Sequence, residues 1–279
     1  MGVIIIIRLQ IEDINMSRTN LTSLQKMKVE QDKITVLTAY DASFSHALEQ
    51  AGIDIILVGD SLGMVIQGQE STLPVTVDDM VYHTANVVRG TEQVFVIADL
   101  PFMSYANVEQ AIKNSARLMA EGGAQMVKLE GGQVVLDIIQ QLVERGIPVC
   151  AHLGLLPQSV HRLGGYRVQG RDQTSADQLI VDAKAVQAAG AAMLVIECVP
   201  ATLAKQITDA VDIPVIGIGA GKDCDGQVLV LYDMLGLTPG RRPRFSHDFL
   251  ADTGAIPAAI AKYVVDVKSA TFPSEAQQF

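Results

Sequence analysis

The sequence predicts an α/β protein with a (β/α)8 barrel fold, and two observations support that fold class. Eight short apolar runs, each long enough for a buried parallel strand, alternate with segments of helical length along the 279 residues. No Pro- or Gly-rich linker interrupts this alternation, and barrels of this kind commonly form one domain at this length. A doubly wound sheet is the alternative. It usually carries a Gly-rich fingerprint after its first strand, and residues 40–43 contain no Gly.

The expected strands are runs rich in Ile, Val, Leu and Ala with little polar alternation, which is typical of strands buried on both faces. In chain order they span residues 34–39, 53–58, 94–98, 124–129, 148–151, 192–196, 213–218 and 227–231. The turn after the seventh strand, at residues 217–221, is a weak match to a phosphate-binding loop. A tight turn over the barrel mouth is an equally good interpretation of it.

The expected helices are amphipathic or apolar segments that follow these strands and end near Gly residues. They span residues 22–28, 44–51, 78–90, 107–121, 134–145, 176–189, 200–211 and 255–268, with Thr22 or Ser23 as the cap of the first. Residues 62–74 and 155–175 are rich in Gly and polar side chains, so both are expected to be loops that contact substrate.

Three segments are expected along the chain. Residues 1–15 form an unstructured extension or precede an alternative start, because Met16 begins a more natural opening and Val3 to Ile7 make a poor signal peptide. Residues 16–270 form a single catalytic domain that begins with the short helix at 22–28, and residues 271–279 form a frayed tail. No apolar run approaches the length that spans a bilayer.

Composition excludes several classes of partner. A hydrophobic content of 49% is ample for a large core, and a net charge of -10 argues against nucleic acid or an anionic membrane as partner. Cys150, Cys198 and Cys224 are too few and too scattered for a disulfide framework or a zinc knuckle. These features favour a cytoplasmic protein with small-molecule substrates.

Acidic residues follow the apolar runs at the second, third and fourth expected strands, as in the run from Ile53 to Asp60. In a parallel barrel Asp60, Asp99 and Glu130 would therefore be neighbours on one rim. Three carboxylates at that distance repel one another unless a cation neutralises them, and oxygen ligands suit Mg²⁺ or a similar hard ion. The alternative is that each acid caps a helix or bonds a loop.

Other polar residues near these strand ends are candidate substrate contacts. Lys128 lies on the same strand face as Glu130 and could meet a substrate carboxylate, or form a structural ion pair. Ser61 could donate a hydrogen bond to an anionic substrate, or cap a helix. His152 ends the fifth strand and could bind substrate or a loop carbonyl.

Glu197 ends the sixth strand, across the barrel from the three acids, and its apolar neighbours suit it to general-base catalysis. The alternative is an ion pair with an Arg of the 155–175 loop. Cys198 is discounted as a nucleophile because no His lies near it in the sequence.

Eight motifs, taken together and in order, resemble the ketopantoate hydroxymethyltransferase family. They run from about Thr22 to Phe249, and only the ordered set is specific. The motifs are Leu37-Thr38-Ala39-Tyr40-Asp41, Val58-Gly59-Asp60-Ser61-Leu62-Gly63-Met64-Val65, Ile97-Ala98-Asp99-Leu100-Pro101-Phe102, Val127-Lys128-Leu129-Glu130-Gly131-Gly132, His152-Leu153-Gly154-Leu155, Glu197-Cys198-Val199-Pro200, Gly219-Ala220-Gly221 and Asp225-Gly226-Gln227-Val228-Leu229-Val230.

The resemblance implies a barrel of the phosphoenolpyruvate/pyruvate type that works in pantothenate, and hence coenzyme A, biosynthesis. It implies transfer of a one-carbon unit from 5,10-methylenetetrahydrofolate to 3-methyl-2-oxobutanoate, through a Mg²⁺-stabilised enolate, to give 2-dehydropantoate. Asp60, Asp99 and Glu130 would bind one Mg²⁺ per subunit, Ser61, Asp99 and Lys128 would contact the ketoacid, and Glu197 would accept the proton. Asp60 and His152 complete the expected substrate contacts. A homodecamer is also implied.

Two rival hypotheses remain at this point. A metal-dependent 2-oxo acid carbon–carbon lyase or mutase of the same barrel superfamily shares the enolate chemistry and would turn over without folate. A barrel that only binds a metal–carboxylate ligand would not need Glu197.

Overall fold

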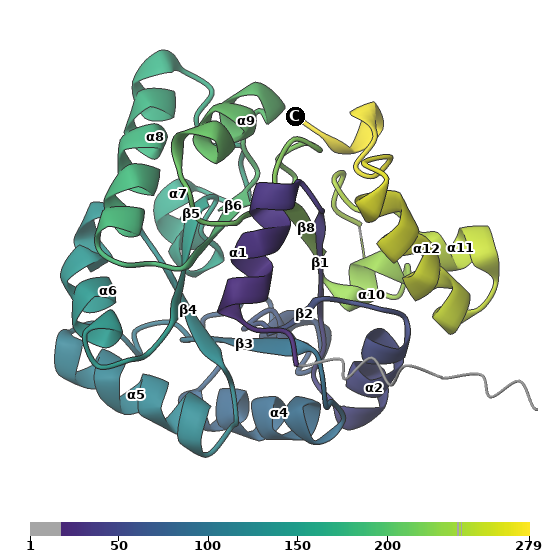
Figure 1. Ribbon diagram of the computed structural model, residues 1–279, viewed down its shortest axis with the longest axis horizontal. Helices are drawn as coiled ribbons and strands as arrows, with labels where there is room; N and C mark the ends of the chain where they lie inside the picture. The colour runs from purple at the N-terminus through teal and green to yellow at the C-terminus, as the bar shows by residue number, and fades with distance from the viewer. Residues whose placement is uncertain (1–17, 239, 241) are drawn as a thin grey trace, which may run out of the picture.

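Eight parallel strands close into a barrel in sequence order, and the last strand pairs back to the first (Figure 1). The computed structural model describes residues 18–238, 240 and 242–279, so the expected extension at residues 1–15 lies outside the described residues. The predicted (β/α)8 barrel is confirmed. Its strands are β1 (Ile34–Thr38), β2 (Ile55–Val58), β3 (Phe95–Asp99), β4 (Met126–Glu130), β5 (Val149–Gly154), β6 (Met193–Glu197), β7 (Val215–Ile218) and β8 (Gly226–Leu229).

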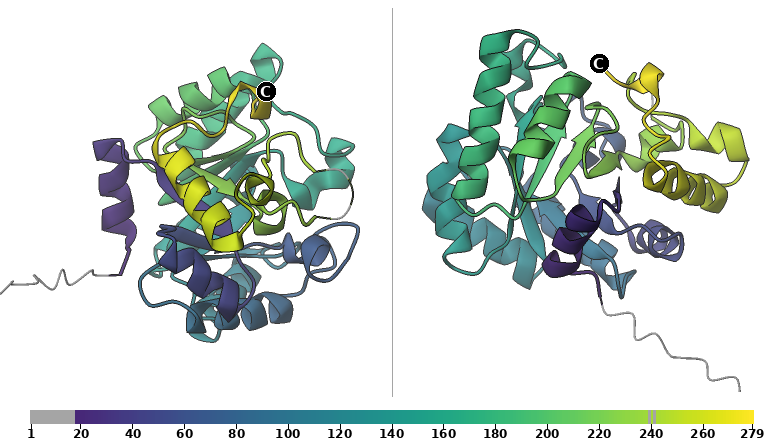
Figure 2. Two further views of the ribbon diagram at one scale, coloured as in Figure 1. Left: turned by 90° about the vertical axis from the view of Figure 1, so that its right-hand side faces the viewer. Right: turned by 45° about the horizontal axis from the view of Figure 1, so that its top comes forward.

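Helices surround the barrel on its outer face (Figures 1 and 2). The longer ones are α1 (Leu21–Glu30), α2 (Ala42–Gln50), α4 (Val77–Arg89), α5 (Val108–Ala120), α6 (Leu136–Val143), α8 (Gln173–Ala188), α9 (Ala201–Ala210) and α12 (Ile256–Lys268). Short helical turns are α3 (Leu62–Val65), α7 (Val160–Leu163), α10 (Leu231–Met234) and α11 (Phe249–Thr253). None of these four turns was predicted from the sequence, because one turn is too short to show a helical period.

Two apolar layers explain why the strands read as continuous hydrophobic runs. One face of each strand packs inside the barrel, where Val36, Leu57 and Ile97 belong to one buried cluster. The other face packs against the surrounding helices, where Leu37 and Ile56 belong to a second, larger cluster. Because side chains alternate along a strand, burial on both faces leaves no polar alternation to see.

Helix α1 covers the N-terminal end of the barrel and stands out from the body of the molecule at that end (Figure 2, left). Its Leu24 is 1% exposed and packs in the barrel-interior cluster with Ile34 and Ile55, at the first positions of their strands. The helix is capped by Asn20, whose side chain accepts the Ser23 N–H at 3.0 Å, so the expected cap at Thr22 or Ser23 was wrong by two or three residues.

The C-terminal segment binds to the barrel instead of fraying. The Tyr263 hydroxyl of α12 lies 2.9 Å from the carbonyl oxygens of both Val36 in β1 and Gln227 in β8, where the barrel closes. Phe272 is 6% exposed and packs against the rings of Phe249 and Tyr263. The frayed tail expected at residues 271–279 therefore differs from the structure, because an apolar anchor outweighs proximity to the chain terminus. Among the described residues, no helix has the length and apolar character needed to cross a membrane.

Candidate active site

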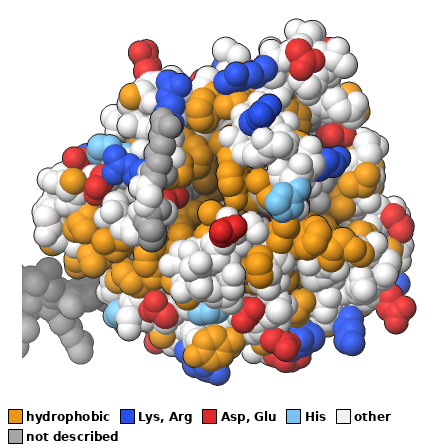
Figure 3. All heavy atoms as spheres, turned by 180° about the vertical axis from the view of Figure 1, so that it is seen from behind, with side chains coloured by type: hydrophobic (Ala, Val, Ile, Leu, Met, Phe, Trp, Pro, Cys, Tyr) orange, Lys and Arg blue, Asp and Glu red, His pale blue; other side chains and the backbone are white. Residues whose placement is uncertain are grey.

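The C-terminal ends of the strands gather the polar residues that the sequence singled out. Strand register pairs Asp99 of β3 with Lys128 of β4, and Glu130 of β4 with His152 of β5. Asp60 lies just past the end of β2, and its backbone N–H donates to Asp99 Oδ2 at 3.1 Å. These strand ends lie opposite α1, on the face shown in Figure 3, where hydrophobic side chains surround a hollow. The predicted convergence of strand ends thus brings these five residues together.

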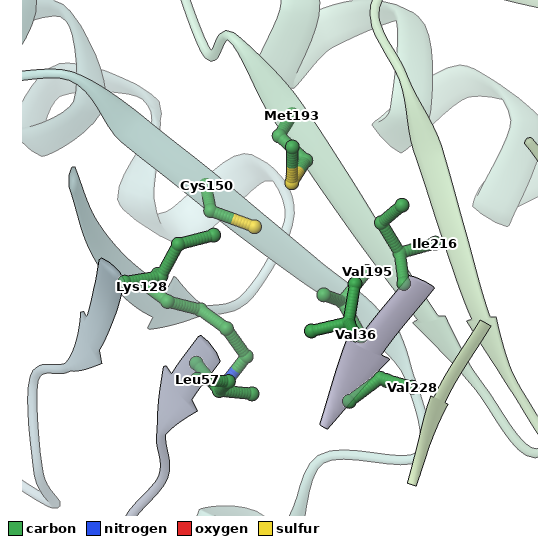
Figure 4. Close-up of a pocket in the computed structure, with 9 residues that line it drawn as sticks. Val36, Leu57, Lys128, Cys150, Met193, Val195, Ile216 and Val228 are labelled. Atoms are coloured by element: carbon green, nitrogen blue, oxygen red, sulfur yellow. The ribbon is translucent and has the colours of Figure 1, made fainter. Parts of the chain in front are cut away.

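Lys128 forms a buried ion pair with Asp99. Its Nζ lies 2.6 Å from Asp99 Oδ1, and the two side chains are 5% and 4% exposed. The lysine side chain also lines a small cavity inside the barrel and extends there toward Leu57 (Figure 4). Burial alone would lower the pKa of Lys128, but the negative charges of Asp99, Glu130 and Asp60 outweigh it and raise that pKa, so the ammonium stays charged.

Asp60 and Glu130 carry more negative charge than Lys128 can neutralise. Burial raises the pKa of Asp60 well above its usual value, and the charges of Asp99 and Glu130 raise it further. Burial is also the main cause that raises the pKa of Glu130, to about 7, although Lys128 opposes the shift. A cation that entered this site would relieve the repulsion, and the donors are the oxygen ligands that a hard ion prefers.

The carboxylates do not form a preassembled metal centre. Over the part of the chain that the structure describes, no group of three or more His, Cys, Asp or Glu side chains is arranged so that it could hold a metal ion. Asp99 is instead bound to Lys128, while Asp60 and Glu130 each accept a hydrogen bond from Gln158. Carboxylate oxygens are ligands that suit Mg²⁺. In this structure the same oxygens accept hydrogen bonds from Lys128 and Gln158.

His152 lies between the acid cluster and Glu197. Its Nε2 is 3.2 Å from Glu197 Oε2 and its Nδ1 is 3.6 Å from Glu130 Oε1. Neither contact has hydrogen-bond geometry, so both ring nitrogens are buried without a hydrogen-bond partner among the described residues. Burial lowers the pKa of His152, and the Lys128 charge lowers it further despite Glu197. Both ring nitrogens therefore have unused hydrogen-bonding capacity.

Glu197 is the most accessible carboxylate of the set, with 12% of its side chain exposed. The Leu155 N–H donates to its carbonyl oxygen at 2.8 Å, which ties the end of β6 to the loop after β5. The next residue, Cys198, has a φ of 47°, a left-handed conformation that few non-Gly residues adopt. Burial, followed by the Glu197 charge, raises the pKa of the Cys198 thiol, which agrees with discounting it as a nucleophile.

Ser61 belongs to a hydroxyl chain and does not cap a helix. It precedes α3, yet its side chain makes no capping hydrogen bond. Its Oγ lies 2.9 Å from the Tyr40 hydroxyl, which itself donates to Thr38 Oγ1 at 2.9 Å. Since the Tyr40 proton is used on Thr38, Ser61 donates to Tyr40. The helix-cap alternative for Ser61 was therefore wrong.

Gln158 and Tyr105, which connect the carboxylates, were not predicted from the sequence. Gln158 lies in a short 3-10 turn after β5, and Tyr105 lies before α5. The Tyr105 hydroxyl donates to Gln158 Oε1 at 2.6 Å. Gln158 is 98 residues from its partner Asp60, so no local pattern marks the contact. Its position inside the predicted substrate-facing loop was the only signal available.

The closed parallel barrel places the chain in the class of (β/α)8 barrel proteins. The fold is similar to that of 2,3-dimethylmalate lyase, a PEP mutase/isocitrate lyase superfamily member, with a TM-score of 0.55 at 15% identity over 88% of this chain and 94% of that one. Within this class, residues 18–275 match the profile of the ketopantoate hydroxymethyltransferase family. The chain belongs to that family, as its motifs predicted.

Curated relatives support the same assignment. A 3-methyl-2-oxobutanoate hydroxymethyltransferase from Nitrosococcus oceani is 64% identical over 92% of this chain and 98% of the relative. A protein of the same name from Alkalilimnicola ehrlichii is 57% identical over 92% of both chains. The chain thus spans nearly the full length of these relatives.

Proposed function

We propose that this chain transfers a hydroxymethyl group to 3-methyl-2-oxobutanoate. The one-carbon unit comes from 5,10-methylenetetrahydrofolate, water supplies the hydroxyl, and the products are 2-dehydropantoate and tetrahydrofolate, in the pathway to pantothenate. Family membership supports the reaction. The observation in the structure that carries the proposal is the line of groups from the Lys128–Asp99 ion pair, past Glu130, to His152 and Glu197. It provides a cation for a carboxylate substrate at one end and a candidate base at the other.

Lys128 would bind the carboxylate of the ketoacid. An ammonium has three donors, and Asp99 occupies one of them in the structure. A second N–H can therefore meet a substrate oxygen without breaking the existing ion pair, and a charged donor and acceptor strengthen that bond. We propose Asp60, Ser61 and His152 as the remaining substrate contacts. His152 is the best supported of these three, because its ring nitrogens have no hydrogen-bond partner in the described chain.

We propose Asp60, Asp99 and Glu130 as the residues that hold one Mg²⁺ per subunit. Burial and like charge raise the pKa of both Asp60 and Glu130, and a bound cation would favour the ionised form of each carboxyl, which supports this assignment. When bound there, the ion would act as a Lewis acid that polarises the 2-oxo group and makes the C3 proton more acidic. The protein's part is to supply oxygen donors and to keep Lys128 charged beside them.

Glu197 would accept the C3 proton of the ketoacid. Its greater exposure, compared with the three buried acids, allows a substrate atom to reach its carboxylate. The lowered pKa of His152 beside it disfavours a positive charge that would hold the carboxylate in an ion pair. A positioned base contributes roughly 100- to 10 000-fold to such a proton transfer. The carbanion formed at C3 would then form a carbon–carbon bond to the one-carbon unit. The bonds from that carbon to the folate nitrogens break, tetrahydrofolate leaves, and water supplies the hydroxyl.

Deuterium exchange at C3 of 3-methyl-2-oxobutanoate, followed by NMR, tests the proton transfer without the folate step. We expect Mg²⁺-dependent exchange by the wild type, and loss of exchange in Glu197→Gln and Asp99→Asn. No exchange by the wild type, even with tetrahydrofolate present, would overturn the proposal. The lyase or mutase alternative is not retained, because the structural likeness to a lyase comes at 15% identity and indicates the fold alone.

Three further properties belong to the same proposal. We propose that the chain forms a homo-oligomer, with a decamer as the expected form. We also propose a cytoplasmic location, and the three buried free cysteines are compatible with a reducing compartment. Arg167, Arg171 and Lys222 are candidates for binding the acidic tail of the folate, and all three lie on loops. Light scattering of the purified protein would test the decamer, which requires about ten times the 29.9 kDa of one chain.

A further inference from the structure

Gln158 joins two acidic residues that come from different strands. Its side-chain Nε2 donates to Asp60 Oδ2 at 2.8 Å and to the carbonyl oxygen of Leu100 at 3.0 Å. Its backbone N–H donates to Glu130 Oε2 at 3.1 Å. This N–H is free for Glu130 because it belongs to the first turn of a 3-10 helix, where backbone donors have no partner within the helix. One buried residue thus contacts both carboxylates.

Tyr105 fixes which way the Gln158 amide points. The Tyr105 hydroxyl donates to Gln158 Oε1 at 2.6 Å and accepts the Glu130 backbone N–H at 3.3 Å. If the amide were turned over, its oxygen would face the Asp60 carboxylate and the Leu100 carbonyl, which are both acceptors. Only one orientation therefore satisfies all the groups, and it presents the amide N–H donors to Asp60.

The network leaves an oxygen of each acid unused by Gln158. It occupies Oδ2 of Asp60 and Oε2 of Glu130, while Oδ1 and Oε1 of the same carboxylates do not contact Gln158. Two buried like charges repel each other, so without a connecting donor their side chains would move apart or turn away. Hydrogen bonds from an amide to carboxylates are charge-assisted, and they fix the direction of the remaining oxygens.

We propose that Gln158, oriented by Tyr105, is a positioning residue that sets the affinity of the carboxylate site for a divalent cation. The inference rests on the proposed function, because it requires Asp60 and Glu130 to be cation ligands. Groups that hold ligands in place in this way typically contribute roughly 10- to 100-fold to metal affinity. The role differs from catalysis, because Gln158 acts on the ligands and need not touch the substrate.

The test uses Mn²⁺ alone as the probe, with free ion measured by electron paramagnetic resonance on the full-length protein. In Gln158→Leu, which keeps the side-chain volume and removes the amide, we expect Mn²⁺ affinity to fall by about tenfold or more. Gln227→Leu is the matched control: Gln227 is also buried and its Nε2 donates to the Gly221 carbonyl at 2.9 Å, away from the carboxylates. We expect the control to bind Mn²⁺ as the wild type does.

Tyr105→Phe separates the positioning role from a general loss of stability. It removes the hydroxyl that orients the amide and that also accepts the Glu130 backbone N–H, so we expect a smaller fall, of about threefold or more, with an unchanged fold by circular dichroism. In Gln158→Leu, deuterium exchange at C3 should recover as Mn²⁺ is raised, since the defect lies in affinity and Glu197 is intact. If the substitution instead displaced the base Glu197, added Mn²⁺ would not restore the exchange.

The outcomes separate the two proposals. If the wild type binds Mn²⁺ and both Gln158→Leu and Tyr105→Phe bind it equally well, the positioning role is overturned while the proposed function stands. If Gln158→Leu does not fold, the test rests on Tyr105→Phe. Binding of Mn²⁺ by that variant with wild-type affinity would overturn the positioning role of Gln158. If the wild type binds no Mn²⁺, the metal site of the proposed function fails, and the role of Gln158 fails with it.

Discussion

The two ends of the barrel treat charge in opposite ways. At the N-terminal end, Asp54 accepts the Thr35 N–H at 2.8 Å and lies 3.1 Å from the Lys268 ammonium. Asp225 pairs with Lys28 at 2.7 Å at the same end. Both of these carboxylates precede a strand, and each pairs with a lysine, although Lys268 also lies 3.2 Å from Asp32. Each of the two carboxylates thus has a positive partner.

At the C-terminal end, three buried carboxylates share one lysine. Asp60, Asp99 and Glu130 surround Lys128, and burial together with like charge raises the pKa of Asp60 and Glu130. The same strands therefore carry a stabilising arrangement at one end and a destabilising one at the other. Such stored repulsion is typical of functional sites, where stability is given up for binding or catalysis.

The largest effect is expected at the C-terminal end, from Glu197→Gln. We expect C3 deuterium exchange and turnover to fall by about 100- to 10 000-fold, because the amide cannot accept the proton. Thermal stability should change little, since Glu197 makes no ion pair with Lys or Arg in the described structure. The matched control is Glu121→Gln, which removes a carboxylate that pairs with Arg117 on the surface. If Glu197→Gln and Glu121→Gln exchanged the C3 proton at the same rate, Glu197 would not be the proton acceptor.

The next effect is expected at the N-terminal end, from Leu24→Ala. Truncating a fully buried leucine should cost about 2–5 kcal/mol of unfolding free energy, measured by urea denaturation. The exchange rate per folded molecule should not change, because Leu24 lies at the opposite end from the acids. Val29→Ala, at an exposed position of the same helix, is the control and should be nearly neutral. If the folded Leu24→Ala variant lost C3 exchange, the N-terminal end would affect catalysis as well as stability.

The pH dependence of stability should have opposite signs at the two ends. Because the pKa of Glu130 is raised to about 7 from 4.5, the folded protein keeps a proton that the unfolded chain has released. In the metal-free protein, the contribution of Glu130 to the unfolding free energy should therefore be most favourable below pH 4.5. It should fall as the pH rises toward 7. Thermal midpoints across this range should show the slope in the wild type and a reduced slope in Glu130→Gln. A steeper slope in the variant would contradict the assignment of this pH dependence to burial of Glu130.

Glu49 is the matching acid at the N-terminal end. Burial alone would raise its pKa, but the backbone N–H groups of Gln93, Val94 and Glu92 donate to it and lower the pKa. The stability that Glu49 contributes is present above the pKa that its carboxyl has in the unfolded chain. This stability is lost as the pH falls through the lower pKa of the folded protein. Glu49→Gln should therefore flatten the loss of stability below pH 4.5 and leave the change toward pH 7 intact. If instead it altered the neutral range, the two ends would be coupled.

The smallest effect is expected from Asn20→Ala, which removes the cap of α1. Loss of an Asn cap typically costs about 1 kcal/mol, and thermal denaturation would show it as a modest drop in midpoint. Thr22→Ala is the control, because Thr22 makes no capping hydrogen bond although the sequence favoured it. If Thr22→Ala were the more costly change, the cap assignment would be wrong.

The barrel was predictable because its signal is local. Each strand is a short apolar run, several of them followed by a charged residue, and parallel topology then brings distant strand ends such as Asp99 and Lys128 to one rim. The resemblance to a known family supplied the assigned roles, which hydrophobic spacing cannot provide. Ser61 shows this limit: its position was found, whereas its hydrogen bond to Tyr40 depends on side-chain packing.

What escaped prediction depends on contacts between distant segments. Gln158 meets Asp60 across 98 residues, and nothing around either residue indicates the pairing. One-turn helices such as α10 are too short to show a period, and Asn20 competed with two neighbouring hydroxyl residues as a cap. Phe272 was assigned to a loose tail because its aromatic partners lie on other elements.

The closing contact made by Tyr263 sets an order of events during synthesis. Strand β1 pairs with β8, from Ile34 with Gly226 to Leu37 with Leu229, and the Tyr263 hydroxyl reaches both strands at this seam. A ribosome therefore releases β1 with one free edge long before its second partner exists, and the residue that joins the two strands emerges later still. Pairings over such distances form slowly, and open strand edges invite wrong partners. We therefore expect this barrel to close only after β8 and Tyr263 have been synthesised, with one edge of β1 unpaired until then.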